Sequence, residues 1–363
     1  MKILHVAWLD NNKSNGVSVV VPNHIKYQSA LVQVALLNTS NISLDIPEEE
    51  INYPIFSLGD CPQGNIGLLP SPFNDPDIVI FHGVYFYYYY KTMGFLLNMK
   101  IPYIVIPHGS LTSFAQEKKK WKKKIGNILV FNKFINNSRC IQFLTQEEKI
   151  SSNWEGESFI CGNGMSSRTC IVDKKKNSDF FHFTYIGRLA LFQKGLDILL
   201  EACYSISDEM RGKKIKLNIY GPDDQGDKKK VLHLIEKYKI QDIVCLSNPV
   251  YGKEKEKILQ NSDVFVLTSR FEGQPLSVIE ALLMGIPVLL TPGTNIANEV
   301  VSNNCGWCAE LSVKDVADKI LEIFNLKKQI AQYSLNASKY AEKNYSWEEI
   351  AKKTVSGYKK LLR

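Results

Sequence analysis

Short apolar runs alternate with longer amphipathic stretches along most of this chain. The runs are rich in β-branched residues, which is typical of buried strands, and the stretches between them repeat apolar positions with helical spacing. Such alternation predicts parallel sheets that carry helices on both faces. The predicted strands are Ile3–Leu9, Ile78–His82, Tyr103–Pro107, Ile141–Thr145 and Ser158–Cys161 in the first half, and Phe183–Gly187, Lys216–Tyr220, Ile243–Ser247, Val264–Thr268 and Val288–Leu290 in the second.

A polar segment without periodicity, residues 166–180, separates the two halves and predicts a linker. A chain of 363 residues is long for one core, which favours two domains. We predict two doubly wound α/β domains, residues 1–165 and 166–345. They are expected to face one another across a cleft at the carboxyl ends of both sheets, where ligands bind in such folds. Residues 346–363 contain an amphipathic, basic helix, predicted for Trp347–Leu361.

Composition adds few constraints. Hydrophobic residues make up 45% of the chain and the formal charge is +7, which describes a globular protein with a mild basic excess. The eight cysteines are scattered, which favours free thiols in a reducing compartment over a disulfide framework. Cys305-Gly-Trp-Cys308 has the spacing of a redox dithiol, but it precedes a strand-like run instead of opening a helix, so we interpret the spacing as coincidence. The histidines lack ligand spacing, and no metal site is predicted.

The first residues and the longest apolar runs bear on location. The start, MKILHVAWLD, predicts a strand and not a signal peptide, because no small-residue cleavage site follows. No run approaches the roughly 18 apolar residues of a membrane span. We expect a cytoplasmic protein. If it contacts a membrane, we expect a peripheral contact with the inner face of the plasma membrane.

The most informative stretch is SRFEGQPLSVIEAL, residues 269–282, directly after the predicted strand Val264–Thr268. It predicts a turn and then a helix whose first position is Pro275, where a missing N–H costs nothing. The first N–H groups of that helix, with the positive end of its dipole, form a site for a phosphate. Glu272 precedes the turn, and Glu280 lies among apolar helix residues, where a charge needs a partner or a ligand unless it faces solvent. Two carboxylates beside an anion site indicate a ligand with hydroxyl groups and phosphate.

A second group of residues precedes this stretch in the same half of the chain. Arg188 follows the predicted strand Phe183–Gly187, and Lys194-Gly195 opens an apolar helix. Two cations above the strand ends can hold a diphosphate and offset its charge as it leaves. The alternative is a pair of ordinary surface charges. Cations at a helix N-terminus are unfavourable unless an anion is bound, which favours the diphosphate.

Together these motifs resemble the donor-binding signature of family-4 glycosyltransferases, the glycosyl transferases group 1. That family consists of retaining enzymes with the GT-B fold, in which two Rossmann-like domains face each other. The resemblance rests on GRL-x(4)-KG (187–195), EGQPLSVIEA (272–281) with its Glu-x(7)-Glu spacing, and GIPV (285–288). Three further motifs extend it over nearly the whole chain: PHGSL (107–111), CGNGM (161–165) and YSWEEIA (345–351). It implies an acceptor-binding first domain, a nucleotide-sugar-binding second domain, and a final helix that crosses back to the first.

The resemblance also implies a role for each matching residue. Arg188 and Lys194 would bind the nucleotide diphosphate, and Glu280 would hydrogen-bond the ribose hydroxyls. Glu272 would contact the transferred sugar, and His108 would hydrogen-bond that sugar and position its anomeric carbon. The expected catalytic residues are therefore His108, Glu272, Arg188 and Lys194. The remaining donor-binding residues are the turn of Gly273, Gln274, Pro275 and Leu276, in which the N–H groups other than that of Pro275 contact the distal phosphate, and Gly16, in the turn after the first strand.

The implied chemistry is retaining transfer from a UDP-sugar or GDP-sugar to a saccharide or lipid-linked saccharide, as in bacterial lipopolysaccharide or capsule biosynthesis. The cations would stabilise the negative charge that grows on the leaving diphosphate, so no cofactor and no metal are expected. The base would lie against Tyr220–Asp224 and Val250–Lys253. A glycosidase would also use two carboxylates, but a hydrolase needs no diphosphate site. The alternatives are a nucleotide-sugar epimerase on the same fold and a non-catalytic partner subunit of a glycosylation complex.

A polybasic segment in the first domain, EKKKWKKKIGN (117–127), holds six lysines and a tryptophan. On a helix Lys122, Lys123 and Lys124 would form a basic face beside an apolar foot of Trp121 and Ile125. That pattern fits an anionic membrane surface in contact with Lys118–Lys124, and a solvated lysine-rich helix fits it equally well. Nucleic acid fits poorly, because no recognised binding module surrounds the lysines.

An aromatic run, VYFYYYY (84–90), lies upstream of the polybasic segment. We interpret it as packing between helices, in preference to the lining of an acceptor cleft or an interface.

Overall fold

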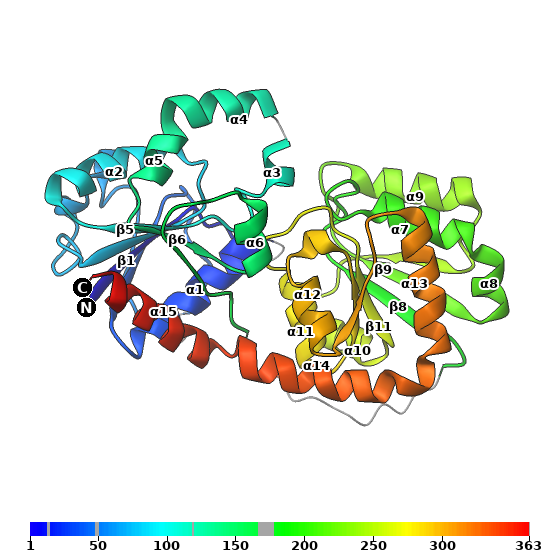
Figure 1. The fold of residues 1–363 in the computed structure, drawn as a ribbon. Helices are drawn as coiled ribbons and strands as arrows, with labels where there is room; N and C mark the ends of the chain where they lie inside the picture. The colour runs from blue at the N-terminus through cyan, green and yellow to red at the C-terminus, as the bar shows by residue number, and fades with distance from the viewer. Residues whose placement is uncertain (13–14, 48–50, 118–119, 166–177, 363) are drawn as a thin grey trace. The chain divides into compact units, whose positions relative to one another are not determined.

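The computed structural model describes residues 1–12, 15–47, 51–117, 120–165 and 178–362. The chain divides into two compact units, one formed by Met1–Gly164 with Tyr345–Arg363 and the other by Met165–Asn344 (Figure 1). Most of the predicted linker, together with Lys118 and Lys119 of the polybasic segment, lies outside the described residues.

The first unit is a doubly wound parallel sheet in the order β3-β2-β1-β4-β5-β6-β7. Its strands are β1 (Lys2–Ala7), β2 (Gln33–Asn38), β3 (Ile55–Phe56), β4 (Ile78–His82), β5 (Tyr103–Ile106), β6 (Cys140–Phe143) and β7 (Ser158–Ile160). Its helices are α1 (Gly16–Ser29), α2 (Tyr87–Met99), α3 (Ser113–Glu117), α4 (Lys120–Gly126), α5 (Asn132–Asn136), α6 (Gln146–Ser151) and α15 (Trp347–Leu361), with short turns η2 (Pro62–Gly64) and η3 (Ile66–Leu68) and a π-helix, η4 (Asn127–Phe131).

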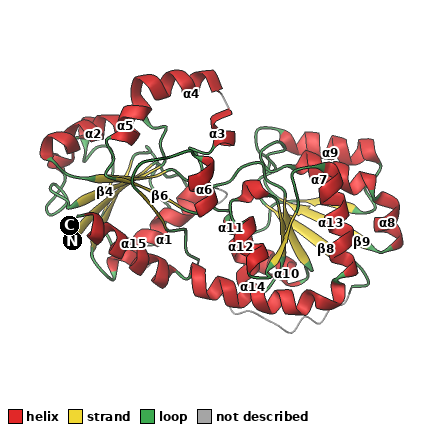
Figure 2. Cartoon of the chain, viewed as in Figure 1, coloured by secondary structure: helices red, strands yellow, loops and turns green. Residues whose placement is uncertain are grey.

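Both faces of this sheet are covered, so the first unit has two apolar cores (Figure 2). One core contains α2 and α5, and the other contains α1 together with the returning helix α15, whose Tyr358 is fully buried. The strand order reverses between β1 and β4. The loops that follow those two strands therefore separate to opposite faces, and a ligand crevice forms at the carboxyl ends of strands at such a reversal.

The second unit is also a doubly wound parallel sheet, in the order β10-β9-β8-β11-β12-β13. Its strands are β8 (Phe181–Ile186), β9 (Ile215–Tyr220), β10 (Val244–Ser247), β11 (Val264–Leu267), β12 (Val288–Leu290) and β13 (Gly306–Cys308). Its helices are α7 (Leu196–Ser205), α8 (Ser207–Gly212), α9 (Asp227–Tyr238), α10 (Gly252–Gln260), α11 (Leu276–Leu283), α12 (Ala297–Ser302), α13 (Val313–Asn325) and α14 (Ile330–Tyr345), with turns η5 (Pro292–Thr294) and η6 (Lys327–Gln329).

The predicted fold class is confirmed in both units, and each predicted strand overlaps an observed one. In the second unit the strand order reverses between β8 and β11. Arg188 and Lys194 follow β8, and Glu272 follows β11. The motifs singled out in the sequence thus flank the reversal point of this sheet, where doubly wound folds bind ligands.

Two local predictions were wrong by a few residues. Pro275 is the N-cap of α11, with φ −77° and ψ 106°, and the helix begins one residue later, at Leu276. An extended N-cap lets the chain enter the helix from the preceding turn. The strand near the Cys305–Cys308 pair runs through the motif as β13 and does not follow it. Burial raises the thiol pKa of both cysteines to about 11, opposite to the shift in a reactive dithiol.

Candidate active site

The loop between β8 and α7 is pressed against the end of β11. The N-cap of α7 is Gly195, with a left-handed φ of 63°. A Cβ atom at this position would lie 1.9 Å from the carbonyl oxygen of Thr268, so only glycine permits the approach. The Thr268 hydroxyl donates to the carbonyls of Lys194 and Gly195, at 3.2 and 3.0 Å. The two signature motifs are therefore locked together through backbone contacts.

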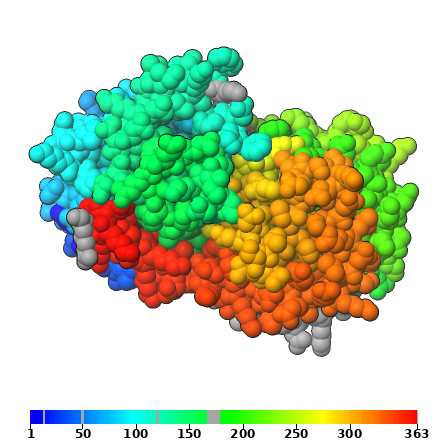
Figure 3. Space-filling model, viewed as in Figure 1, coloured from blue at the N-terminus to red at the C-terminus, as the bar shows by residue number. Residues whose placement is uncertain are grey.

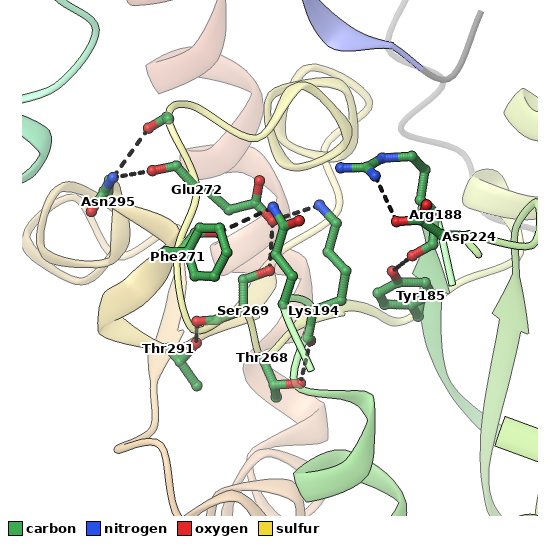
Figure 4. Close-up of polar contacts among 12 residues, drawn as sticks. Tyr185, Arg188, Lys194, Asp224, Thr268, Ser269, Phe271, Glu272, Thr291 and Asn295 are labelled. Carbon is green, nitrogen blue, oxygen red and sulfur yellow. Dashed lines mark hydrogen bonds and ion pairs between the residues drawn. The ribbon is translucent and has the colours of Figure 1, made fainter. Parts of the chain in front are cut away.

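This close approach brings Lys194 and Glu272 into direct contact (Figure 4). Lys194 Nζ lies 2.5 Å from Glu272 Oε1, and each side chain is only 11% exposed. The hydroxyl of Ser269 donates to the same carboxylate oxygen at 2.7 Å. Lys194, which the sequence predicts to bind the diphosphate, thus forms a largely buried ion pair with Glu272, which the sequence predicts to contact the sugar.

The turn that follows Glu272 is held from behind by Asn295. The Asn295 amide donates to the backbone carbonyls of Glu272 and Gly273 (Figure 4). Asn295 lies in the left-handed region, with φ 62°, at the end of η5, and it is 5% exposed. Sequence reasoning missed both Ser269 and Asn295. Ser269 stood inside the signature stretch, whereas nothing in the sequence distinguishes Asn295 from an ordinary turn residue.

Arg188 lies on the other side of the same loop and has a separate partner. Its Nη1 is 2.7 Å from Asp224 Oδ2, on the loop after β9. The hydroxyl of the buried Tyr185 donates to the Arg188 carbonyl at 2.6 Å and fixes the backbone there. Arg188 keeps 37% of its side-chain surface exposed, so it remains accessible to a ligand. Asp224 falls inside the segment predicted to meet the base, but its contact with Arg188 was not predicted.

Glu280 lies on α11 with an 8% exposed side chain, so the alternative of a solvated helix face is wrong. Its partner is Lys255 of α10, which forms an ion pair with Glu280 Oε2. The prediction that a charge among apolar neighbours needs a partner is confirmed. Lys255 itself was missed, because it lies in a run of alternating lysines and glutamates that is typical of a solvated helix.

His108 belongs to the first unit, directly after β5, in a left-handed turn. His108 has φ 51° and Gly109 has φ 79°. The turn is fixed by Glu148, whose Oε1 accepts from Gly109 N at 2.5 Å and whose Oε2 accepts from Leu144 N at 2.8 Å. Glu148 is fully buried, and burial raises its carboxyl pKa to about 7 against the opposing effect of these two N–H groups. Sequence reasoning missed Glu148. The signal that could have found it is its position three residues after the N-cap Thr145, which matches a capping-box pattern.

Gly16, the other predicted contact in the first unit, is the first residue of α1. The side chain of Asn15 caps that helix by accepting from Val17 N at 3.3 Å. Gly16 is exposed, with its backbone at the helix N-terminus, a position that suits an anion. Its contact with the diphosphate stays a prediction.

The aromatic run Val84–Tyr90 is confirmed as packing. Tyr89 is fully buried and donates to the His82 carbonyl at 3.0 Å. Tyr85, Tyr88 and Tyr90 pack against the same apolar core, and Tyr87 is exposed.

A comparison with known protein families supports the resemblance drawn from these motifs. Residues 167–344, nearly the whole second unit, match the family described as glycosyl transferases group 1. The chain carries a group 1 glycosyl transferase domain. The resemblance drawn from GRL-x(4)-KG and EGQPLSVIEA is thereby confirmed for the unit that holds both motifs.

Relatives of this domain occur in bacteria and archaea. The chain is 29% identical over 165 residues to the poly(ribitol-phosphate) alpha-N-acetylglucosaminyltransferase of Staphylococcus aureus, covering 45% of this chain and 32% of that protein. It is 27% identical over 241 residues to glycosyltransferase MJ1607 of Methanocaldococcus jannaschii, covering 64% and 59%. It is 24% identical over 240 residues to the capsular polysaccharide biosynthesis glycosyltransferase CapM of Staphylococcus aureus, covering 62% and 60%. The chain thus matches less than two thirds of the length of each of these relatives.

Solved structures extend the likeness to the whole fold. Sucrose-phosphate synthase of Thermosynechococcus elongatus superposes with a TM-score of 0.77 at 15% identity, covering 99% of both chains. Anabaena HepE, solved with UDP and glucose, gives a TM-score of 0.70 at 16% identity, covering 99% of this chain and 100% of that one. At this identity the likeness establishes the fold, and the chain has the GT-B architecture of two parallel-sheet α/β domains.

Proposed function

We propose that this chain is a retaining glycosyltransferase that moves a sugar from a nucleoside-diphosphate sugar to a saccharide or lipid-linked saccharide in surface polysaccharide biosynthesis. The observation that carries the proposal is the convergence of Lys194 and Glu272 at the reversal point of the second sheet. Names of relatives support the reaction class, since they include an alpha-N-acetylglucosaminyltransferase and a capsular polysaccharide biosynthesis glycosyltransferase. HepE, solved with UDP-glucose, supports a uridine donor.

The arrangement suits a reaction in which a glycosyl–phosphate bond breaks. Negative charge then grows on the leaving diphosphate while positive charge grows on the sugar. Arg188, Lys194 and the N-terminus of α11 are held in place before the reaction, so they stabilise the leaving group without reorganising. In this proposal these groups provide the charge neutralisation that a metal ion provides in other enzymes. The leaving phosphate takes the acceptor's proton, and attack on the same face of the sugar retains its configuration.

The carboxylates hold hydroxyl groups in this proposal and do not act as an acid–base pair. Glu272 contacts the sugar and Glu280 contacts the ribose. In the free protein each carboxylate is paired with a lysine, Lys194 and Lys255 respectively. A donor would add hydrogen bonds to carboxylates that are already neutralised, which avoids burying an unpaired charge when the site is empty.

A thermal-shift panel of UDP-sugars and GDP-sugars tests the donor site. A ligand at about 100 times its Kd stabilises the folded protein by about 2.7 kcal/mol, so the correct donor raises the melting temperature of the wild type. Lys194→Ala is expected to abolish that rise. Lys319→Ala is the matched control, because Lys319 forms an ion pair with Glu322 elsewhere in the same unit. A donor that shifts wild type and Lys194→Ala equally contradicts the site.

Release of nucleoside diphosphate separates the proposal from its alternatives. A transferase releases it in proportion to added acceptor saccharide, whereas an epimerase interconverts nucleotide sugars without acceptor and without release. A non-catalytic partner does neither. The proposal is supported if release depends on acceptor and if NMR of the glycosylated product shows the same anomeric configuration as the donor sugar.

We also propose an anionic membrane surface as a partner of the first unit. No helix among the described residues is long and apolar enough to span a bilayer. Helix α4, at the top of the view in Figures 1 and 3, and its neighbours α3 and η4 expose several large apolar side chains. They are Phe114, Trp121, Ile125, Ile128 and Leu129, each at least 50% exposed. Lys122 and Lys124 are exposed beside them.

The apolar foot is larger than the sequence predicted. Trp121, Ile125, Ile128 and Leu129 recur with the spacing of one helix face. Lys123 was predicted to belong to the basic face, and this prediction is wrong. Its Nζ instead donates to the Ala115 carbonyl. An exposed apolar stripe beside lysines suits the headgroup region of an anionic leaflet, where each lysine contributes about 1 kcal/mol.

Flotation with vesicles of phosphatidylcholine, with and without phosphatidylglycerol, tests the membrane proposal. We expect binding only to the anionic vesicles. Trp121→Ser/Ile125→Ser and Lys122→Gln/Lys124→Gln should each weaken binding. Leu68→Ser is the control, because Leu68 is 59% exposed elsewhere in the same unit. Equal flotation of all variants, or no flotation of the wild type, removes this proposal and leaves the transferase proposal unaffected.

A further inference from the structure

Four of the chain's six histidines form one hydrogen-bonded cluster in the first unit. His108 Nε2 lies 3.1 Å from His82 Nδ1, and His82 Nε2 lies 3.0 Å from His5 Nδ1. His5 Nε2 lies 2.8 Å from Gln28 Oε1. These contacts make a continuous chain from the turn after β5, through His82 at the end of β4 and His5 within β1, to the side chain of Gln28 on α1. His24, the fourth histidine, contacts Gln28 from the side.

The cluster is deeply buried, and its imidazoles are neutral. His5, His82 and His24 are at most 5% exposed, and His108 is partly buried. Burial lowers the pKa of His5 and of His108 to about 4 and that of His24 to about 3, and it lowers the pKa of His82 well below its usual range. Each ring therefore carries one N–H and one lone pair at neutral pH. Among the described residues no group of three or more potential metal ligands is placed to hold a metal ion.

The returning helix α15 fixes the orientation of the Gln28 amide. The Thr354 hydroxyl donates to the carbonyl oxygens of Ile350 and Ala351, at 3.0 and 3.1 Å. It also lies 3.2 Å from His24 Nε2, the ring nitrogen that the Gln28 amide contacts. Toward Gln28 the hydroxyl oxygen accepts, from the amide nitrogen at 2.8 Å. The Gln28 NH2 group consequently faces Thr354, and it also donates to His24 Nε2 at 2.9 Å. The Gln28 carbonyl oxygen is left to face His5.

The direction of every remaining bond follows. Gln28 Oε1 accepts, so His5 carries its proton on Nε2 and presents a lone pair on Nδ1. His82 must therefore donate from Nε2 to His5, which leaves a lone pair on His82 Nδ1. His108 must then donate from Nε2 to His82. The only ring nitrogen of His108 outside this chain of bonds is Nδ1, and it carries a lone pair.

We propose that Gln28, His5 and His82 are positioning residues that hold His108 in a single tautomer, protonated on Nε2, so that Nδ1 can only accept a hydrogen bond. The role of this tautomer rests on the proposed function: Nδ1 of His108 accepts a hydrogen bond from a hydroxyl group of the transferred sugar. His108 then cannot serve as a general acid. A neutral ring is also compatible with positive charge growing on the sugar, which an imidazolium would oppose.

The tautomer is read directly from long-range proton–nitrogen NMR spectra of protein labelled with ¹⁵N-histidine. Protonated and lone-pair ring nitrogens have different shifts and couplings, and exposed His233 provides an internal reference. In the wild type we expect His108 as a single species protonated on Nε2. The finding of His108 protonated on Nδ1, or as a mixture, overturns the proposal without requiring any variant to fold.

A matched pair of variants tests the relay, the chain of hydrogen bonds from Gln28 through His5 and His82 to His108. His5→Phe keeps a ring at a buried position but removes the acceptor of His82, so His108 should become a mixture of tautomers. His24→Phe alters an equally buried ring that contacts Gln28 without lying between Gln28 and His108, so the single tautomer should persist. Circular dichroism establishes that both variants are folded. An unchanged His108 spectrum in folded His5→Phe rejects the relay.

Donor turnover separates failure of the relay from failure of the proposed function. We expect the kcat of His5→Phe to fall about tenfold, the rate equivalent of one hydrogen bond, with a smaller change in the donor KM and no change in His24→Phe. A correct tautomer in a wild type that turns over no nucleotide sugar supports the relay and rejects the proposed function. A tautomer mixture in His5→Phe with wild-type kcat rejects the relay's role in positioning.

Discussion

The buried pair of Lys194 and Glu272 offers a sharp test, because its two members can be removed singly and together. Lys194→Met removes the cation and leaves a carboxylate that is 11% exposed with the Ser269 hydroxyl as its remaining side-chain hydrogen bond. Glu272→Gln removes the anion and leaves the lysine. The double variant removes both charges and keeps similar volumes.

The expected magnitudes follow from burial. Breaking a buried ion pair by removing one partner costs about 3–5 kcal/mol, because the remaining charge stays desolvated. Since Ser269 still contacts the carboxylate, we expect the lower end, about 3 kcal/mol, for Lys194→Met. A domain of this size loses about 2–4 °C in Tm per kcal/mol, so its melting temperature should fall by about 6–12 °C. The double variant should recover to within about 1 kcal/mol of wild type.

Thermal unfolding of the four proteins without ligand gives the double-mutant cycle. The pair Lys319–Glu322 in the same unit is the control, because its side chains are 24% and 49% exposed. Exposed pairs couple by less than about 1 kcal/mol. A coupling between Lys194 and Glu272 no larger than that of the control would refute the claim that these residues form a buried, preorganised pair.

Three further perturbations have defined outcomes. Lys255→Met should destabilise the second unit by about 3 kcal/mol, because it strands the buried Glu280 carboxylate, and equal melting of wild type and variant in calorimetry contradicts this. The carboxyl pKa of Glu148 is raised from 4.5 to about 7, so the folded state binds the extra proton in this window and the free energy of unfolding should fall by about 3 kcal/mol as the pH rises from 4.5 to 7. Urea titrations at several pH values measure this change, and in Glu148→Gln the fall in unfolding free energy should be smaller by about 3 kcal/mol. The same fall in wild type and Glu148→Gln argues against the raised pKa of Glu148. Gly195→Ala should abolish donor binding in calorimetry, because its Cβ would overlap the Thr268 carbonyl, and wild-type affinity would show that the loop can move aside.

Most of the fold could be predicted because parallel strands form continuous apolar runs. The strands that were missed lack that signal. The run before and through β2 continues the apolar pattern of α1 without a strong turn residue between them, and β3 spans only Ile55–Phe56. The strand near β13 was predicted to follow the cysteine pair, because the three residues of β13, Gly306–Cys308, coincide with the cysteine motif.

The candidate site was predictable as far as its residues stand in signature motifs. Glu280 could be assigned a partner in principle, since a charge among apolar neighbours needs one, but the partner Lys255 could not be chosen from several similar lysines on α10. The histidine relay could not be predicted at all. Its members come from β1, β4 and the turn after β5, and only the pairing of β1 with β4 and of β4 with β5 brings them together. Histidine spacing along the chain therefore gave no signal.

The central claim is that the second unit binds the diphosphate of a nucleotide sugar through Lys194 and Arg188. Isothermal titration of the wild type with UDP and UMP, and with GDP and GMP, tests it most directly. For one of the two bases we expect the diphosphate to bind at least about tenfold more tightly than the monophosphate, because the second phosphate receives at least one charge-assisted hydrogen bond. Lys194→Met should remove this difference. Equal affinity for diphosphate and monophosphate with both bases, or a difference that survives in Lys194→Met, would contradict it.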